Sequence, residues 1–177
     1  LSAAPTGGDD DNGHDTIDGG AGDNTLDFTV ANTADLIHND VTVSNIQDVH
    51  IDMTAAATAD LDGQQFGETA GSADVDTITV RNNIAAAGVA DFDVNDLDAG
   101  VLVRVQHSSA DANDDVGDTD VYIHQADGTH ATDDSQTVEI ISGTNTSETF
   151  DFTLNIQAND ADAVDPDDAA VENVTII

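Results

Sequence analysis

Apolar and polar residues alternate along many short segments of this chain. Residues 149–156 (TFDFTLNI) carry apolar side chains at every second position and polar ones between them, which is typical of a half-buried β-strand. The same pattern predicts strands at residues 24–30, 45–53, 74–80, 101–106, 120–124, 137–141, 149–156 and 171–177. Polar, Gly/Asp/Asn/Thr-rich loops join these segments, and several are long for simple hairpins.

Helical periodicity is hard to find. The best candidate, residues 55–66, contains Thr, Asp and Gly and has no apolar stripe at a spacing of 3.6 residues. The sequence therefore predicts an all-β fold of twisted sheets arranged like a sandwich, opening with a short N-terminal calcium β-roll. A β-helix solenoid is the alternative fold.

The chain also resembles itself. Residues 43–51 (VSNIQDVHI) and 171–176 (VENVTI) share the pattern V-x-N-[IV], followed by Val or Ile at alternate positions. This similarity indicates a repeated β unit. We expect the first copy to lie inside a sheet and the second, an apolar strand, to be available for donation to a neighbouring protomer.

Acidic residues dominate the charge. There are 37 of them against two arginines, Arg81 and Arg104, which gives a formal net charge of -35. Most of the acids are Asp, a residue that favours turns. Repulsion among so many negative charges would destabilise a compact fold unless bound divalent cations or a brine offset it. Charge alone would also permit disorder, but the β alternation argues against it. Nucleic acid is excluded as a partner, because its phosphates would be repelled and the sequence has no basic patch.

Cysteine is absent, which excludes disulfides, thiol catalysis and Cys-based metal sites. No apolar run reaches the roughly 18 residues of a transmembrane helix, so we expect no transmembrane segment. The first residue is Leu1, and we expect a processed secretory product or a segment of a longer chain.

The sharpest motif is a pair of contiguous nine-residue blocks. Residues 19–27 (GGAGDNTLD) fit the calcium repeat G-G-x-G-x-D-x-U-x, with Asn24 in the usual place of Asp, and residues 10–18 (DDNGHDTID) have two acids where the pattern has its first two glycines. Glycines let the turn carbonyls converge on a cation, and the apolar residue of each block points inward. The candidate ligands here are Asp10, Asp11, Gly13, Asp15, Asp18, Gly20, Gly22, Asn24 and Asp27.

This tandem nonapeptide resembles the repeat-in-toxin (RTX) family, and the rest of the chain resembles the β-rich repeats of bacterial RTX-type surface-layer and adhesin proteins. Residues 45–51 (NIQDVHI) and 173–176 (NVTI) look like a strand that recurs in those repeats. The resemblance implies secretion, Ca²⁺ binding and a lattice or matrix role. It also implies a division into RTX-like nonapeptides at residues 1–30 and a β-rich structural domain at 31–177.

Two further acidic segments are candidate calcium loops. The first, residues 111–120, places oxygen ligands at alternate positions but lacks the Gly and Glu that an EF-hand has at its sixth and twelfth positions. The second, residues 159–168, precedes the last predicted strand. Their candidate ligands are Asp111, Asn113, Asp115, Asp118, Asp120, Asp160 and Asp162. A third segment, residues 91–98, alternates acids with Phe92, Val94 and Leu97, which favours a strand with a polar outer face over a metal loop.

No catalytic pattern is present, and we expect that the protein is not an enzyme. The six histidines are scattered without the spacing of a zinc site, and there is no nucleophile elbow or phosphate-binding loop. Five Phe, one Tyr and no Trp offer little to build an apolar pocket around a catalytic carboxyl.

These patterns together favour an extracellular, calcium-stabilised protomer of a self-assembling surface layer, filament or biofilm matrix. Such a protein would form homo-oligomers or polymers, with the C-terminal strand as a candidate contact. Two alternatives are a repeat segment of a calcium-dependent adhesin and an acidic surface protein of a halophile.

Overall fold

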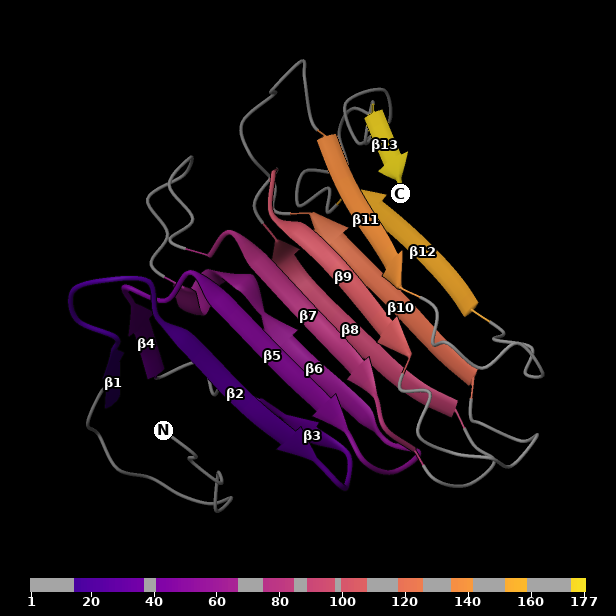
Figure 1. Ribbon diagram of the computed structural model, residues 1–177, viewed down its shortest axis with the longest axis horizontal. Coiled ribbons are helices and arrows are strands. Elements are labelled where there is room, and N and C mark those ends of the chain that lie inside the picture. The colour runs from indigo at the N-terminus through magenta and orange to yellow at the C-terminus, as the bar shows by residue number, and fades with distance from the viewer. Residues whose placement is uncertain are drawn as a thin grey trace, which may run out of the picture.

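The structure, a computed structural model, describes residues 15–36, 41–66, 75–84, 89–97, 100–107, 118–125, 135–141, 152–158 and 173–177. Thirteen strands and one 3₁₀ turn occupy this part of the chain (Figure 1). They are β1 (Asp15–Asp18), β2 (Thr25–Val30), β3 (Ala34–Asp35), β4 (Val41–Ser44), β5 (Asp48–Met53), β6 (Thr58–Asp62), η1 (Gly63–Phe66), β7 (Thr77–Asn82), β8 (Val89–Leu97), β9 (Leu102–His107), β10 (Asp118–Gln125), β11 (Ser135–Ile141), β12 (Phe152–Ala158) and β13 (Asn173–Ile176).

The strands form two large sheets and one small one. Sheet I has six strands in the order β13-β11-β9-β7-β5-β2, and sheet II has five in the order β12-β10-β8-β6-β3. β1 and β4 form a separate pair. From β5 to β13, successive strands alternate between sheets I and II, so each strand lies beside the strand two places along the chain, as Figure 1 shows.

Every strand pair in the described residues is parallel. The chain therefore returns in the same direction each time it re-enters a sheet, and equivalent residues of successive strands stack in register. One such column in sheet I is Leu26, Val49, Ile78, Val103, Val138 and Ile176. Its first five members are at most 4% exposed.

Sheets I and II share one hydrophobic core. Inward side chains of sheet I, such as Ile51 and Val80, belong to the same buried cluster as Phe92, Val94 and Ile123 of sheet II. The alternation in sequence produces this core directly, because successive residues of a strand point to opposite faces. Burial of these columns between the sheets supplies the main driving force for folding.

A few polar side chains are buried where the chain passes between the sheets. Asn82, at the end of β7, donates from Nδ2 to Thr119 Oγ1 of β10 at 2.7 Å, and Ile84 N donates to Asn82 Oδ1 at 3.0 Å. Gln136 of β11 is fully buried and donates from Nε2 to Val101 O at 3.0 Å. These contacts tie neighbouring segments together and satisfy groups that would be costly to bury alone.

The all-β prediction is confirmed, and each of the eight predicted strands overlaps an observed one. The segment 91–98 is also a strand, since β8 buries Phe92, Val94 and Leu97 and turns Asp91 and Asp93 outward. Three strands were not predicted: β3, β4 and β6. β1 covers the end of the first nonapeptide, which that pattern gives as a short strand, and its apolar Ile17 packs against the core. β6 lies in the segment with no helical stripe and uses the small Ala59 beside Leu61 as its inward residues.

The parallel sheets, with a chain that alternates between them, are consistent with the solenoid alternative. The described residues contain no helix long and apolar enough to cross a membrane. Leu26, the apolar residue of the second nonapeptide, points into the core as that pattern predicts. Its strand, β2, lies before the proposed boundary at residue 30 and pairs with β5, which lies after it.

Candidate functional site: the glycine turn and the charged sheet faces

The second nonapeptide forms a turn between β1 and β2, which we call the glycine turn (residues 18–24). Gly20 and Gly22 adopt φ angles of 78° and 108°, in the left-handed region that glycine enters without strain. Gly19 lies against the backbone of the next segment, where Gly19 N donates to Ser44 O at 3.0 Å and an added Cβ would overlap Asn45 O. The glycines of the motif therefore have steric and conformational reasons to be there.

Asn24 is the centre of this turn. Its Nδ2 donates to Gly22 O at 2.9 Å and to Asn45 O at 2.9 Å, and it lies 3.3 Å from Gly20 O. The Asn24 backbone is held as well, because Asn24 N donates to Gln47 Oε1 at 2.9 Å and Asn24 O accepts from Gln47 N and Asp48 N. Asn24 thus joins its own turn to the following one.

Asp18 closes the other side of the turn. Its Oδ1 accepts from Gly20 N at 2.8 Å and from Asn45 Nδ2 at 2.8 Å. The hydrogen bond from Asn45, followed by that from Gly20, holds the pKa of the Asp18 carboxyl below its ordinary value. Asn45 itself has a left-handed φ of 56°, which Asn tolerates better than most residues.

The residues of this turn do not fit a calcium ion well. Three carbonyl oxygens do converge, as Ca²⁺ requires, but the side chain among them is a neutral amide, and affinity for Ca²⁺ rises with the charge of its ligands. Asp18 Oδ1 is engaged by two donors, and Asp27 lies on β2 beside His50, 3.0 Å from its Nδ1. Within the described ranges, no group of three or more His, Cys, Asp or Glu side chains is placed to hold a metal.

The other predicted ligands lie in different places or outside the described residues. Asp15 and Asp118 begin β1 and β10, and the description of these two residues covers the backbone alone. Asp120 lies in β10, in register with Asp91 of β8, rather than in a loop. The positions outside the described residues are Asp10, Asp11, Gly13, Asp111, Asn113, Asp115, Asp160 and Asp162.

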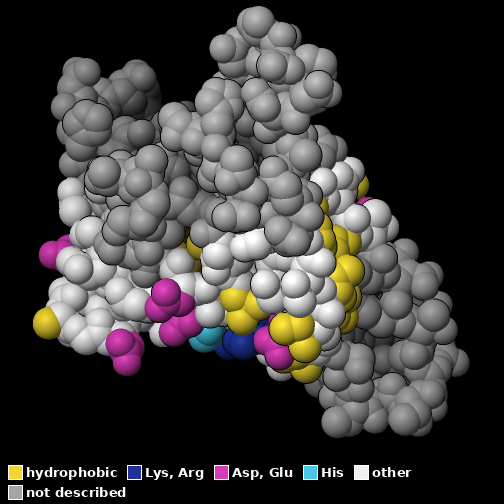
Figure 2. Space-filling view, turned by 90° about the horizontal axis from the view of Figure 1, so that it is seen from above, with side chains coloured by type: hydrophobic (Ala, Val, Ile, Leu, Met, Phe, Trp, Pro, Cys, Tyr) yellow, Lys and Arg dark blue, Asp and Glu magenta, His cyan; other side chains and the backbone are white. Residues whose placement is uncertain are grey.

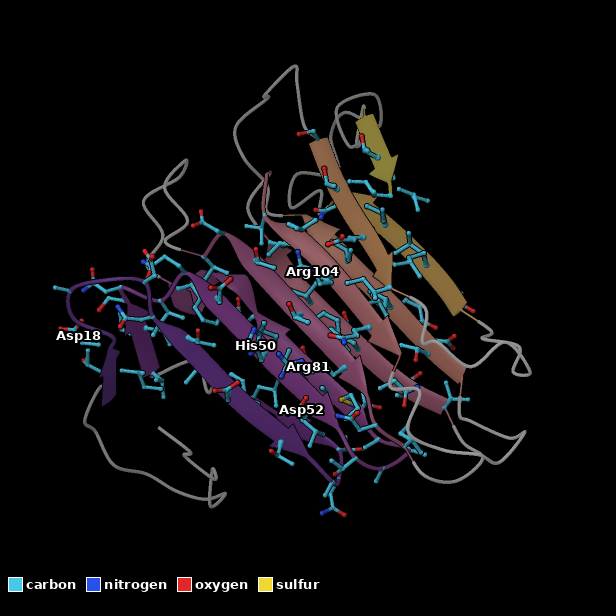
Figure 3. The ribbon with its side chains drawn as sticks, in the orientation of Figure 1. Asp18, His50, Asp52, Arg81 and Arg104 are labelled. Carbon is cyan, nitrogen blue, oxygen red and sulfur yellow. The ribbon has the colours of Figure 1, made fainter. Side chains whose placement is uncertain are left out.

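Both arginines lie on the outer face of sheet I, each beside an acid of the neighbouring strand. Arg104 Nε donates to Glu139 Oε2 at 2.6 Å, and Arg81 NH1 lies 3.5 Å from Asp52 Oδ1. Figure 3 shows Arg81 between the labelled His50 and Asp52, and far from Asp18, which ends β1 of the separate β1–β4 pair. Sequence reasoning missed this network, because its members are 23, 29 and 35 residues apart in the chain.

His50 has two competing partners. Its Nδ1 lies 3.0 Å from Asp27 Oδ1 and 3.0 Å from Arg81 NH2. A protonated Nδ1 can donate to Asp27, and an unprotonated Nδ1 can accept from Arg81, but one nitrogen cannot do both at once. Figure 2 shows the basic side chains beside a histidine, with acidic and hydrophobic side chains around them.

The outer face of sheet II is acidic. Asp60 is in register with Asp93, and Asp91 with Asp120, so like charges lie on adjacent strands. Some are partly compensated: Asn95 Nδ2 donates to Asp60 Oδ1 at 3.1 Å, and His124 Nε2 lies 3.7 Å from Asp93 Oδ1. Like charges placed opposite one another destabilise a sheet, so this face favours bound or screening cations.

Comparisons with known proteins leave the family open: no protein-family pattern, curated protein or solved structure matches the chain.

Proposed function

We propose that the protein is an extracellular structural protein, a calcium-stabilised protomer of a self-assembling surface layer, filament or biofilm matrix. For the fold, we propose a β-helix solenoid. The alternation of strands between two parallel sheets supports it over a sandwich, because each turn of the chain stacks on the turn before.

The observation that carries this proposal is the change in exposure along the apolar columns of sheet I. Inward residues are buried from β2 to β9, yet Val174 and Ile176 of β13, at positions in register with the buried Gln136 and Val138, are 48% and 59% exposed. Ile177 is 69% exposed. Among the described strands, β13 pairs with β11 and is the edge strand of sheet I, so its apolar residues and the backbone groups on its other side could pair with a further strand.

A contact through this edge would build an open-ended assembly. All strands of the stack run in the same direction, so a protomer joined by parallel pairing repeats the contact head-to-tail, and such contacts need not close. Donation of β13 into a neighbour's sheet is a second form of the same contact. Calcium would reduce the repulsion between protomers that each carry a formal charge of -35.

The experiment compares edge variants for assembly in Ca²⁺ by light scattering. The double variant Val174→Lys/Ile176→Lys places charges on the apolar side of β13, and we expect it to stay folded and to lose assembly. Thr175→Lys is the matched control, because Thr175 is exposed on the opposite face of the same strand. Equal assembly by the double variant and the wild type would contradict the proposal.

A further inference from the structure

The strongest unexplained feature of the molecule is the position of one side-chain nitrogen. Asn24 Nδ2 has three backbone carbonyl oxygens within 3.3 Å, those of Gly20, Gly22 and Asn45. Peptide carbonyl oxygens usually converge on one point in this way only around a hard cation, because the cation offsets the repulsion between the oxygens. Here the group at the point of convergence belongs to the chain itself.

The chemistry of the three partners fixes the orientation of the amide. All are acceptors, so a donor must face them, and the opposite orientation would direct Asn24 Oδ1 at three other oxygens. The two amide protons match the two contacts at 2.9 Å, and Gly20 O, at 3.3 Å, is the weaker third partner. The amide group therefore satisfies carbonyls that would otherwise face one another.

The backbone conformation of two turns brings these carbonyls to the Asn24 amide. Gly20 and Gly22 turn theirs inward through positive φ angles, and Asn45 does so from the following turn with a φ of 56°. Asn45 is held in place by its own Nδ2, which donates to Asp18 Oδ1. The three carbonyl oxygens thus come from two successive turns, and the Asn24 amide lies between them.

We propose that the Asn24 side-chain amide takes the place of a bound cation, so that the glycine turn closes without Ca²⁺. The glycine turn is then held to the following turn, which contains Asn45, by hydrogen bonds that need no cation. The inference stands whether or not the protein assembles. It also locates any calcium that the whole chain needs away from Gly20, Gly22 and Asn24.

Asn24→Asp tests this directly, because it replaces the donor with a carboxylate at the same position. In chelator, we expect a melting temperature about 2–4 °C or more below that of the wild type, since a lost hydrogen bond and a new repulsion act together. Added Ca²⁺ should remove this difference between the variant and the wild type, and titration calorimetry should find one more bound ion in the variant. Asn32→Asp, at an exposed bend after β2, is the control for the added charge and should show neither effect.

Nuclear magnetic resonance of the wild type gives a second test that needs no folded variant. The Asn24 side-chain amide signals, identified by sequential assignment of the isotope-labelled wild type, should exchange with solvent more slowly than those of the exposed Asn32 and should not shift in Ca²⁺. The proposal is overturned if Ca²⁺ moves the Asn24 signals in a saturable way. Equal stability and ion stoichiometry of folded Asn24→Asp and Asn32→Asp in both conditions would overturn it as well.

Discussion

At the scale of single residues, short polar side chains set the conformation of the turns. The side chains of Asp18 and Asn24 bond to backbone groups of their own turn or the neighbouring one, and the Asn45 side chain donates to the Asp18 carboxylate. Asp and Asn suit this role because their side chains reach backbone groups one or two residues away. Much of the Asp and Asn content that resembles a set of metal ligands can therefore act as turn chemistry.

The hydrogen bond from Asn45 to Asp18 predicts that the stability of the fold depends on pH in the acid range. The folded-state pKa of Asp18 is lowered, so its contribution to stability is present above the ordinary carboxyl pKa of 3.8 and is lost as pH falls through the folded-state value. Asn45→Gly removes the amide and keeps the left-handed φ accessible.

We expect Asn45→Gly to raise the pKa of Asp18 toward its ordinary value, as measured by carboxyl chemical shifts against pH. The stability difference from the wild type, from urea unfolding, should shrink once the pH falls below both pKa values. A difference that is constant from neutral pH to acid would show that Asp18 ionisation plays no part.

At the scale of elements, buried polar contacts connect the sheets. Asn82 is fully buried between Thr119 Oγ1 and Ile84 N, whereas the adjacent Asn83 is exposed. Substituting a buried partner leaves the remaining groups unsatisfied, which costs about 1–3 kcal/mol each.

Asn82→Ala should therefore lower the free energy of unfolding by about 1–3 kcal/mol, as measured by urea denaturation. The same change at Asn83 should have an effect within about 0.5 kcal/mol, as for an exposed surface position. Comparable losses in the two variants would show that the buried bridge between β7 and β10 adds little.

Individual strands could be predicted from the sequence, but their pairing could not. Alternation identifies β2, β5 and β12 because half-buried strands bury every second residue whichever way their neighbours run. β6 was missed because Ala59 gives a weak apolar signal. The stacking itself was hidden by irregular spacing: partners on adjacent strands of sheet I are separated by 23, 29, 25, 35 and 38 residues in turn, so no fixed period appears.

The glycine turn was located by its motif, but the role of Asn24 was not. The nonapeptide pattern identifies Asn24 only as a replacement for an acidic ligand. Its action as a donor depends on the carbonyl of Asn45, which the fold brings from 21 residues away. The opposed charges around Arg81 and Arg104 likewise appear only once the register of sheet I is known.

At the scale of the whole molecule, the formal charge of -35 opposes folding through self-repulsion. Two arginines offset part of the charge on sheet I, whereas on sheet II carboxylates lie in register on adjacent strands, Asp60 beside Asp93 and Asp91 beside Asp120. Divalent cations that bind the folded state would stabilise it by mass action, and high salt would screen the same repulsion without a specific site.

Circular dichroism can separate these two effects. In low salt, we expect chelation of Ca²⁺ to reduce the β signal and the melting temperature, and added Ca²⁺ to restore both. Recovery by KCl with the chelator still present would favour the halophile alternative. A spectrum and melting temperature unchanged by chelation would show that folding does not depend on calcium.

Sedimentation velocity of the wild-type protein in Ca²⁺, over a range of protein concentrations, tests the proposed structural role most directly. If protomers join through the exposed edge of β13, the sedimentation coefficient should rise continuously with concentration, without stopping at a dimer, as an open head-to-tail contact requires. A folded monomer at every concentration would contradict self-assembly and favour the adhesin-segment alternative.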